Sequence, residues 1–424
     1  MTFVLEINDW ELTLYEDKAI VTQDSAIAAI KGGEIIFGKQ AAQIARLNPK
    51  QSYSQYFSKL NTEKLTEPAP LAKMQADLVY LNLKDLLFRN TEPGADLIIS
   101  VSSSMSNEKL GILLGIIQQL DREVVVFVDS AIAAIAGTSN PQNLTHYLDI
   151  GLHSSCVTEV AIDTEIRKVK STELEEVGFT KAIDLWANDL ADRLVKGSRF
   201  DPLHSADTEQ QLYNQIYKWV DNWAVGDSEP RETSLEIIIK QRDNKWDLHL
   251  AQEHFEKVAF ALYQKIVGAL PDTGHVTLSH RTAKFPGFNR YLSKHGYVTA
   301  IAMNEAIPLG CIANDLSTKQ KDTGIRLINS LKSSGPPHDH YSMTTQDNIP
   351  THFLDLSSGV ALPMEKITAV IQVEIEKRST ELLVTPIGHD IKLNDKTLIS
   401  TSKIVLGDVL AHKEETYSLV LVED

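Results

Sequence analysis

The chain has 424 residues, of which 41 are basic and 57 are acidic, so its formal net charge is −16. A chain of this length predicts two or three domains with a core large enough to need no disulfide or zinc staple. The two cysteines, Cys156 and Cys311, are too few for a disulfide framework or a four-ligand zinc site. We therefore expect a reducing, cytoplasmic compartment.

The charge balance and the hydropathy pattern argue against two classes of partner. An acidic protein is repelled by nucleic acid and by anionic membrane, so neither is expected as a partner. The N-terminus lacks the basic start and the apolar run of a secretory signal. No stretch approaches the ~20 apolar residues that a membrane-spanning helix requires. These observations predict a soluble protein.

The first part of the chain has the pattern of an α/β domain. Short apolar stretches at Phe3–Ile7, Glu11–Tyr15 and Ala19–Thr22 predict a meander of strands. The polar region 51–72 predicts a loop or an insertion. Further along, two apolar strands alternate with two helices between residues 96 and 136, and this order predicts parallel strands with helical crossovers.

The pattern then restarts. Three further strands are predicted between residues 146 and 170, followed by helices and strands as far as residue 316. In the stretch 181–196 the apolar side chains recur every three to four residues, which is typical of one face of a helix. We therefore predict a duplicated α/β unit with one lobe at 1–144, a second at 145–333 and a ligand cleft between them.

The remainder of the chain predicts a small β domain at 338–424. The stretch Ser333–Pro337 is small, polar and rigid, as linkers are. Beyond it, Lys366–Glu376 alternates between apolar and polar residues, which indicates a strand. The histidines His338, His340 and His352 lie near the linker and are interpreted as polar linker residues rather than as metal ligands.

Five stretches in matching order resemble the actin, sugar-kinase and DnaK-type heat-shock ATPase superfamily. The similarity covers about Met1–Leu316 and is greatest to the DnaK-type nucleotide-binding domain. It implies a duplicated actin-like (ribonuclease-H-like) two-lobed fold with a small C-terminal β domain. The stretches are Glu6–Trp10, Leu97–Gly137, Asp149–Ser155, Val276–Arg281 with Phe285–Phe288, and Ala306–Ala313.

The resemblance also implies a site for ATP or ADP with magnesium. Asp149 and Asp129 would be the catalytic carboxylates, and Asp149 with Glu6 would hold hydrated magnesium. The residues that would contact the nucleotide are Glu6, Asn8, Asp9, Gly151, Ser154, Ser155, His280, Arg281 and Gly310. The residues alone allow readings that need no ligand, because Asp149 can cap a turn and Asp129 can cap a helix.

The loops that match the family's nucleotide site depart from its pattern. Acidic side chains beside a triphosphate are repelled unless magnesium lies between them, and large side chains fill the space of a phosphate. Arg281 is open to two interpretations, as a partner of a base or phosphate or as a surface arginine. The replacements are Asn8, Asp9 and Trp10 in the first hairpin, Leu152 and His153 in the second, and His280 and Arg281 in the adenosine turn.

We therefore expect a DnaK-like protein with a degenerate nucleotide site and weak or absent ATP hydrolysis. It would act as a protein-interaction scaffold or chaperone-like factor, with a protein or peptide as its partner. One alternative is an active magnesium-dependent ATPase whose lobes signal to the β domain. Another is a filament-forming actin relative, and the oligomeric state stays open.

Overall fold

The chain divides into two compact units, Met1–Pro337 and His338–Asp424. The computed structural model describes residues 2–138, 144–222, 234–241, 244–317, 327–332, 352–355, 361–364, 371–378, 381–394, 396–404, 408–413 and 415–420. The predicted linker Ser333–Pro337 and the histidines His338 and His340 lie outside these residues. His352 lies in a strand of the second unit.

The first unit contains a six-stranded sheet, here called sheet I. Its central strands are almost wholly apolar because elements cover both faces of the sheet. Three strands form an antiparallel meander, and the other three run parallel to its first strand. The order across the sheet is β18 (Leu327–Ile328), β10 (Glu123–Asp129), β9 (Asp96–Val101), β1 (Thr2–Ile7), β2 (Leu12–Glu16) and β3 (Ala19–Asp24).

A second six-stranded sheet, sheet II, repeats this pattern over five strands. β11, β12 and β13 form the antiparallel meander, and β16 and β17 run parallel to β11. The sixth strand, β19, pairs with the far side of β13. The order is β17 (Tyr297–Ala302), β16 (Gly274–Ser279), β11 (Leu144–Ile150), β12 (Ser154–Ile162), β13 (Glu165–Glu175) and β19 (Ser330–Lys332).

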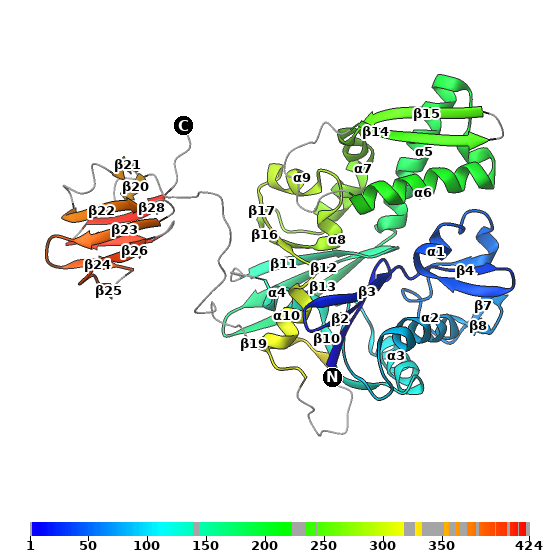
Figure 1. The fold of residues 1–424 in the computed structure, drawn as a ribbon, viewed down its shortest axis with the longest axis horizontal. Coiled ribbons are helices and arrows are strands. Elements are labelled where there is room, and N and C mark those ends of the chain that lie inside the picture. Colours follow the sequence, from blue (N-terminus) through cyan, green and yellow to red (C-terminus); the bar gives the residue numbers. More distant parts are fainter. Residues whose placement is uncertain are drawn as a thin grey trace. The chain divides into compact units, whose positions relative to one another are not determined.

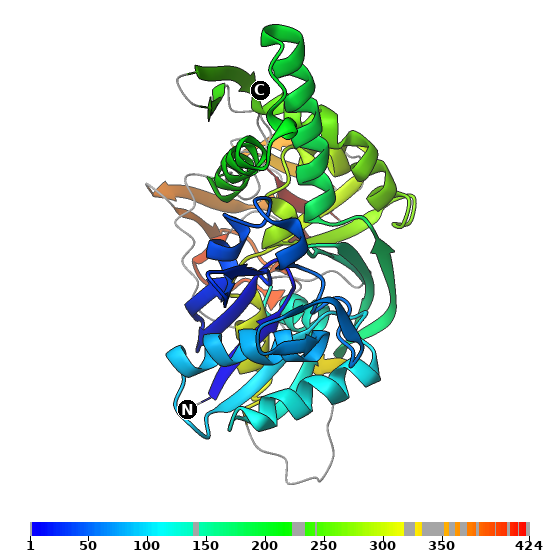
Figure 2. The same cartoon turned by 90° about the vertical axis from the view of Figure 1, so that its right-hand side faces the viewer.

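Helices α2 (Gln75–Asn90) and α3 (Asn107–Gln119) lie side by side and bury their apolar faces against sheet I (Figures 1 and 2). Helix α3 begins where Ser106 accepts a hydrogen bond from the Lys109 amide, as an N-cap residue does. Two shorter helices, α4 (Ser130–Ala136) and α10 (Ala306–Ala313), cross each other between the two sheets. One core therefore joins both halves of the unit.

Each half carries an insertion. In the first half it comprises β4 (Ala28–Lys31), β5 (Glu34–Phe37), α1 (Gly38–Ala42), the 3-10 turn Pro49–Gln51, β6 (Ser52–Tyr53), β7 (Lys64–Ala69) and β8 (Ala72–Met74). The region 51–72, predicted as a loop or an insertion, lies in this insertion and contains the β7–β8 hairpin, which was not predicted. Between β13 and β16 the second half contributes α5 (Phe179–Ser198), the 3-10 turn Pro202–His204, α6 (Ala206–Asn222), β14 (Ser234–Gln241), β15 (Asn244–Ala251) and α7 (Gln252–Val267). The helices α8 (His280–Ala283) and α9 (Phe288–Lys294) connect β16 to β17.

The described residues of the second unit form two sheets around a small apolar core that includes Phe353, Val373 and Leu410. The predicted strand Lys366–Glu376 is described from residue 371 onward, and its strand starts at Val373. The strand order in one sheet is β21 (Ala361–Pro363), β20 (His352–Asp355), β28 (Glu415–Val420), β27 (Val409–His412), β24 (Ile391–Leu393) and β25 (Lys396–Thr397). The strand order in the other sheet is β22 (Val373–Arg378), β23 (Glu381–Pro386) and β26 (Ser402–Ile404).

The predicted α/β class is thus confirmed for the described residues as a set of mixed and antiparallel sheets with helices. Within the same residues, every helix is too short or too polar to cross a membrane.

The crossing of α4 and α10 depends on two glycines. A Cβ atom on Gly310 would lie 2.0 Å from the Ala133 carbonyl oxygen, and one on Gly137 would lie 1.8 Å from the Ala306 carbonyl oxygen. Both distances are shorter than any van der Waals contact, and both neighbours are backbone. The two helices can therefore meet this closely only because these positions lack side chains.

We predict that Gly310→Ala lowers the free energy of unfolding by about 1–3 kcal/mol, because the added methyl group forces the two helices apart. Urea denaturation measures the change. The matched control is Gly111→Ala on α3, where the added methyl group meets no atom within 4 Å. In this control the free energy of unfolding should rise by roughly 0.5–1 kcal/mol, because alanine has a higher helix propensity than glycine. Equal behaviour of the two variants would contradict the close crossing.

Candidate functional site

The β1–β2 and β11–β12 turns interlock where sheets I and II approach each other. Asn8 Nδ2 donates a hydrogen bond to Asp149 Oδ2 at 2.9 Å. Asp9 Oδ1 accepts one from the Leu152 amide at 2.6 Å. A Cβ atom on Gly151 would lie 2.5 Å from Asp9 Oδ1, so any other residue at this position would displace the Asp9 carboxylate. The residues predicted to wrap phosphates therefore bind one another.

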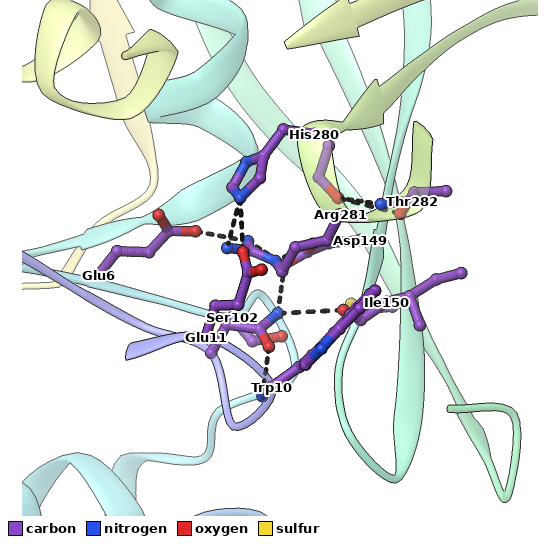
Figure 3. Close-up of polar contacts among 12 residues, drawn as sticks. Glu6, Trp10, Glu11, Ser102, Asp149, Ile150, His280, Arg281 and Thr282 are labelled. Atoms are coloured by element: carbon purple, nitrogen blue, oxygen red, sulfur yellow. Dashed lines mark hydrogen bonds and ion pairs between the residues drawn. The ribbon is translucent and has the colours of Figure 1, made fainter. Parts of the chain in front are cut away.

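Arg281 lies at the centre of the site, and its side chain is fully buried (Figure 3). It belongs to the single-turn helix α8, which starts directly after β16 with Ser279 as its N-cap. Its Nε and Nη2 atoms donate to the two carboxylate oxygens of Asp149, both at 3.1 Å. Nη2 also donates to Glu6 Oε1 at the end of β1. The surface interpretation of Arg281 is therefore wrong.

Both carboxylates of this cluster have charged or polar partners within the chain. Burial alone would lower the pKa of Arg281, but the carboxylates of Asp149 and Glu6 outweigh it and raise the pKa. The Tyr15 hydroxyl donates to the second Glu6 oxygen at 3.0 Å, and burial together with the charge of Glu6 raises the pKa of Tyr15. A two-pronged guanidinium–carboxylate pair of this kind is among the strongest hydrogen-bonded pairs in proteins.

A second ion cluster joins the β1–β2 turn to α8. His280 Nε2 lies 2.9 Å from Glu11 Oε2 (Figure 3). Lys284 Nζ lies 3.0 Å from Glu11 Oε1. Burial would raise the pKa of Glu11, yet the hydrogen bond with His280 and the charge of Lys284 hold it well below its ordinary value. His280, expected to face adenosine, instead pairs with a carboxylate.

Asp129, the other predicted catalytic carboxylate, is also neutralised internally. Its Oδ1 atom accepts hydrogen bonds from the Ser103 hydroxyl at 2.6 Å and from the Ala131 amide at 3.0 Å. Asp129 is thus the N-cap of α4, which is the role that its sequence position allows without a ligand. Its Oδ2 atom lies 2.9 Å from Lys168 Nζ, which β13 of sheet II supplies.

The remaining side chains of the two turns are also engaged. Leu152 is buried, and His153 Nε2 lies 2.9 Å from the Ser54 carbonyl oxygen. Ser154 donates to Glu173, and Ser155 donates to the Val177 carbonyl. The Trp10 ring stacks on Phe179 at the start of α5, with centroids 3.9 Å apart. These side chains of the two turns therefore already have partners within the chain.

Gly310, which was expected to contact the nucleotide, lies outside this cluster. Gly310 lies at the crossing of α4 and α10, where its role is close packing. Among the described residues, no group of three or more histidine, cysteine, aspartate or glutamate side chains is arranged to hold a metal ion. The pocket beside the turns has a volume of about 70 Å³ and is lined by, among others, Asn8, Asp9, Ser102, Asp149, Gly151 and Ser154.

Sequence reasoning missed the cations Lys168 and Lys284 and the partners Tyr15 and Glu11. Lys168 lies in a strand that is mostly polar, so nothing in the pattern distinguishes it from a solvent-exposed lysine. Lys284 follows His280 by four residues, a spacing that places both on one side of a helical turn. That spacing was the one local signal that both could reach the same carboxylate.

Asp9 gives a pH-dependent test of this arrangement. Burial raises its pKa above the ordinary value, and the hydrogen bond from the Leu152 amide opposes the shift only in part. A carboxyl group with a raised pKa favours the folded state below its unfolded pKa. This contribution is lost as the pH rises through the folded pKa. The ionised carboxylate therefore costs stability at neutral pH.

We predict that Asp9→Asn raises the melting temperature at pH 7, because the amide oxygen can keep the Leu152 hydrogen bond without carrying charge. The gain should shrink as the pH falls below the range in which Asp9 ionises. Thermal melts across pH 3–8 measure it, with the exposed Asp17→Asn as control. A lower melting temperature at pH 7, or a gain that does not vary with pH, would contradict this account of Asp9.

Comparison with known proteins adds no family assignment to this geometry. No protein-family model matches the chain, and a search of curated proteins finds no significant match. The functional argument therefore rests on the arrangement of the side chains themselves.

Proposed function

We propose that residues 1–337 form a duplicated, two-lobed unit of the actin and DnaK type. Two features support this. Five strands have the same order and directions in both sheets: β10, β9, β1, β2 and β3 in sheet I, and β17, β16, β11, β12 and β13 in sheet II. The helices that follow β10 and β17 cross between the sheets, as the two connecting helices of that superfamily would. The lobes are then built on sheet I and sheet II.

We further propose that the nucleotide site of this fold is replaced by internal ion pairs. The observation that carries the proposal is the position of Arg281, fully buried between Glu6 and Asp149. These are the two carboxylates that the resemblance assigns to magnesium. Asp129 pairs with Lys168 and Glu11 pairs with His280 and Lys284, so each of these carboxylates already has a counter-charge.

The residues present do not fit magnesium with a nucleotide. The guanidinium of Arg281 occupies both carboxylate oxygens of Asp149, which would otherwise face hydrated magnesium. Leu152 and His153 take the places of phosphate-binding glycines, and His153 is bonded to Ser54. The pocket of about 70 Å³ is far below the roughly 300–1,000 Å³ of small-molecule sites.

The function that this site supports best is that of a DnaK-like pseudo-ATPase. Such a protein acts through contacts with a protein or peptide partner rather than through ATP hydrolysis. The β-rich second unit, with its own core around Phe353 and Leu410, is a natural carrier of such contacts. An active ATPase would require Arg281 to leave Glu6 and Asp149, exposing two buried carboxylates, and is the less favoured function.

We predict that millimolar ATP or ADP with magnesium leaves the melting temperature unchanged, because the ion pairs exclude the ligand. A nucleotide present at 100 times its dissociation constant would stabilise the protein by about 2.7 kcal/mol. Differential scanning calorimetry measures the shift, with magnesium and sodium tripolyphosphate as ionic controls. A nucleotide-specific shift that saturates with concentration would refute the pseudo-ATPase proposal.

A further inference from the structure

The segment Ala26–Arg46 belongs to both lobes at once. It contains β4, β5 and α1, and it enters and leaves from the first half of the chain. Along β5, β4 and the two residues before β4, alternate residues are buried in different cores. Ala26, Ala28, Ile30, Ile35 and Phe37 pack in the core of the first lobe, whereas Ile27, Ala29 and Ile36 pack in the core of the second.

This alternation is the pattern of a strand covered on both faces, because successive side chains point to opposite sides. Here one face rests on the first lobe and the other on the second. Ile27, Ala29 and Ala41 are each at most 5% exposed. They share one hydrophobic core with Ile183, Trp186 and Leu212 of the α5 and α6 helices. The segment therefore forms a wall common to both lobes.

Arg46, at the end of this segment, forms ion pairs with residues of both α5 and α6. Its Nη2 atom lies 2.9 Å from Asp184 Oδ1, and its Nη1 atom lies 3.5 Å from Glu209 Oε1. Its guanidinium carbon lies 3.9 Å from the centre of the Tyr213 ring, and the Tyr213 hydroxyl donates to the same Asp184 oxygen at 2.7 Å. Charge, stacking and hydrogen bonding thus meet at one side chain.

The side chain of Gln210 on α6 binds the backbone of the same segment. Its Oε1 atom accepts a hydrogen bond from the Arg46 amide at 2.7 Å, and its Nε2 atom donates to the Ala42 carbonyl at 3.0 Å. Gln210 is 4% exposed, so both groups would lose their partners if the segment moved away from α6. Leaving buried polar groups unpaired is costly, which favours a single position of the segment.

From these contacts we infer that Ala26–Arg46 is a strap that holds the two lobes permanently closed. Lobes that rotate apart need an interface that can separate without exposing a hydrophobic core. This interface is a shared core, so opening would expose to water the apolar side chains of the segment that face the second lobe, together with their partners on α5 and α6. The inference concerns motion and does not depend on the proposed loss of nucleotide binding.

Distances between spin labels on the two lobes test the strap. Cysteines are introduced at the exposed Lys84 on α2 and Lys196 on α5, while the native Cys156 and Cys311 are buried. Double electron–electron resonance on the full chain should give one narrow distance distribution, the same with and without magnesium–ATP. Two populations, or a change with nucleotide, would overturn the inference.

The strap variant Ile27→Ala with Arg46→Ala should broaden this distribution or add a longer distance. The matched control is Ile116→Ala with Arg89→Ala, which removes the same side chains from within the first lobe, where Arg89 pairs with Asp85 on one helix. The control should keep the narrow distribution. If both pairs behave alike, or if the strap variant stays narrow, then Ala26–Arg46 does not hold the lobes together.

Discussion

The architecture of the first unit depends on how the charge of one buried arginine is balanced. A guanidinium and two carboxylates cannot be removed from water unless each finds a partner with good geometry. Arg281 meets this condition with Asp149 from its own lobe and Glu6 from the other. The pair therefore links the two lobes at the point where the resemblance to DnaK-type proteins places phosphate and magnesium.

The same principle accounts for the surrounding residues. Lys168 of sheet II balances Asp129 of sheet I, and His280 with Lys284 balances Glu11. Each of these pairs crosses from one half of the chain to the other. Together with the shared core under β4 and β5, they make the space between the lobes part of the folded interior. The proposed loss of the nucleotide site and the proposed closure of the lobes would both follow from this internal pairing.

The sequence predicts much of this fold because the decisive signals are local. Apolar strands, the helical spacing in α5 and the cap at Asp129 each depend on neighbours within a few residues. The β7–β8 hairpin was not predicted, because its sequence does not alternate clearly between apolar and polar residues and contains Pro68. The departures from the phosphate-binding pattern were visible in the sequence, and the structure places them where sheets I and II approach each other.

What the sequence could not reveal is which side chains meet. Arg281 contacts Asp149 and Glu6, which lie 132 and 275 residues away along the chain. No local pattern distinguishes such an arginine from one on the surface. The strap is similarly hidden, since the alternation in β4 and β5 becomes informative only when both cores are known.

The most direct test of the internal ion pair is chemical rescue of Arg281→Ala. Truncation leaves two buried carboxylates unpaired and should cost about 3–5 kcal/mol of unfolding free energy. Free guanidinium ion carries the missing group, so millimolar guanidinium chloride should raise the melting temperature of the variant but not of the unaltered chain. Urea, which has a similar shape but no charge, should give no rescue. A variant as stable as the unaltered chain, or one that guanidinium does not stabilise, would contradict the account.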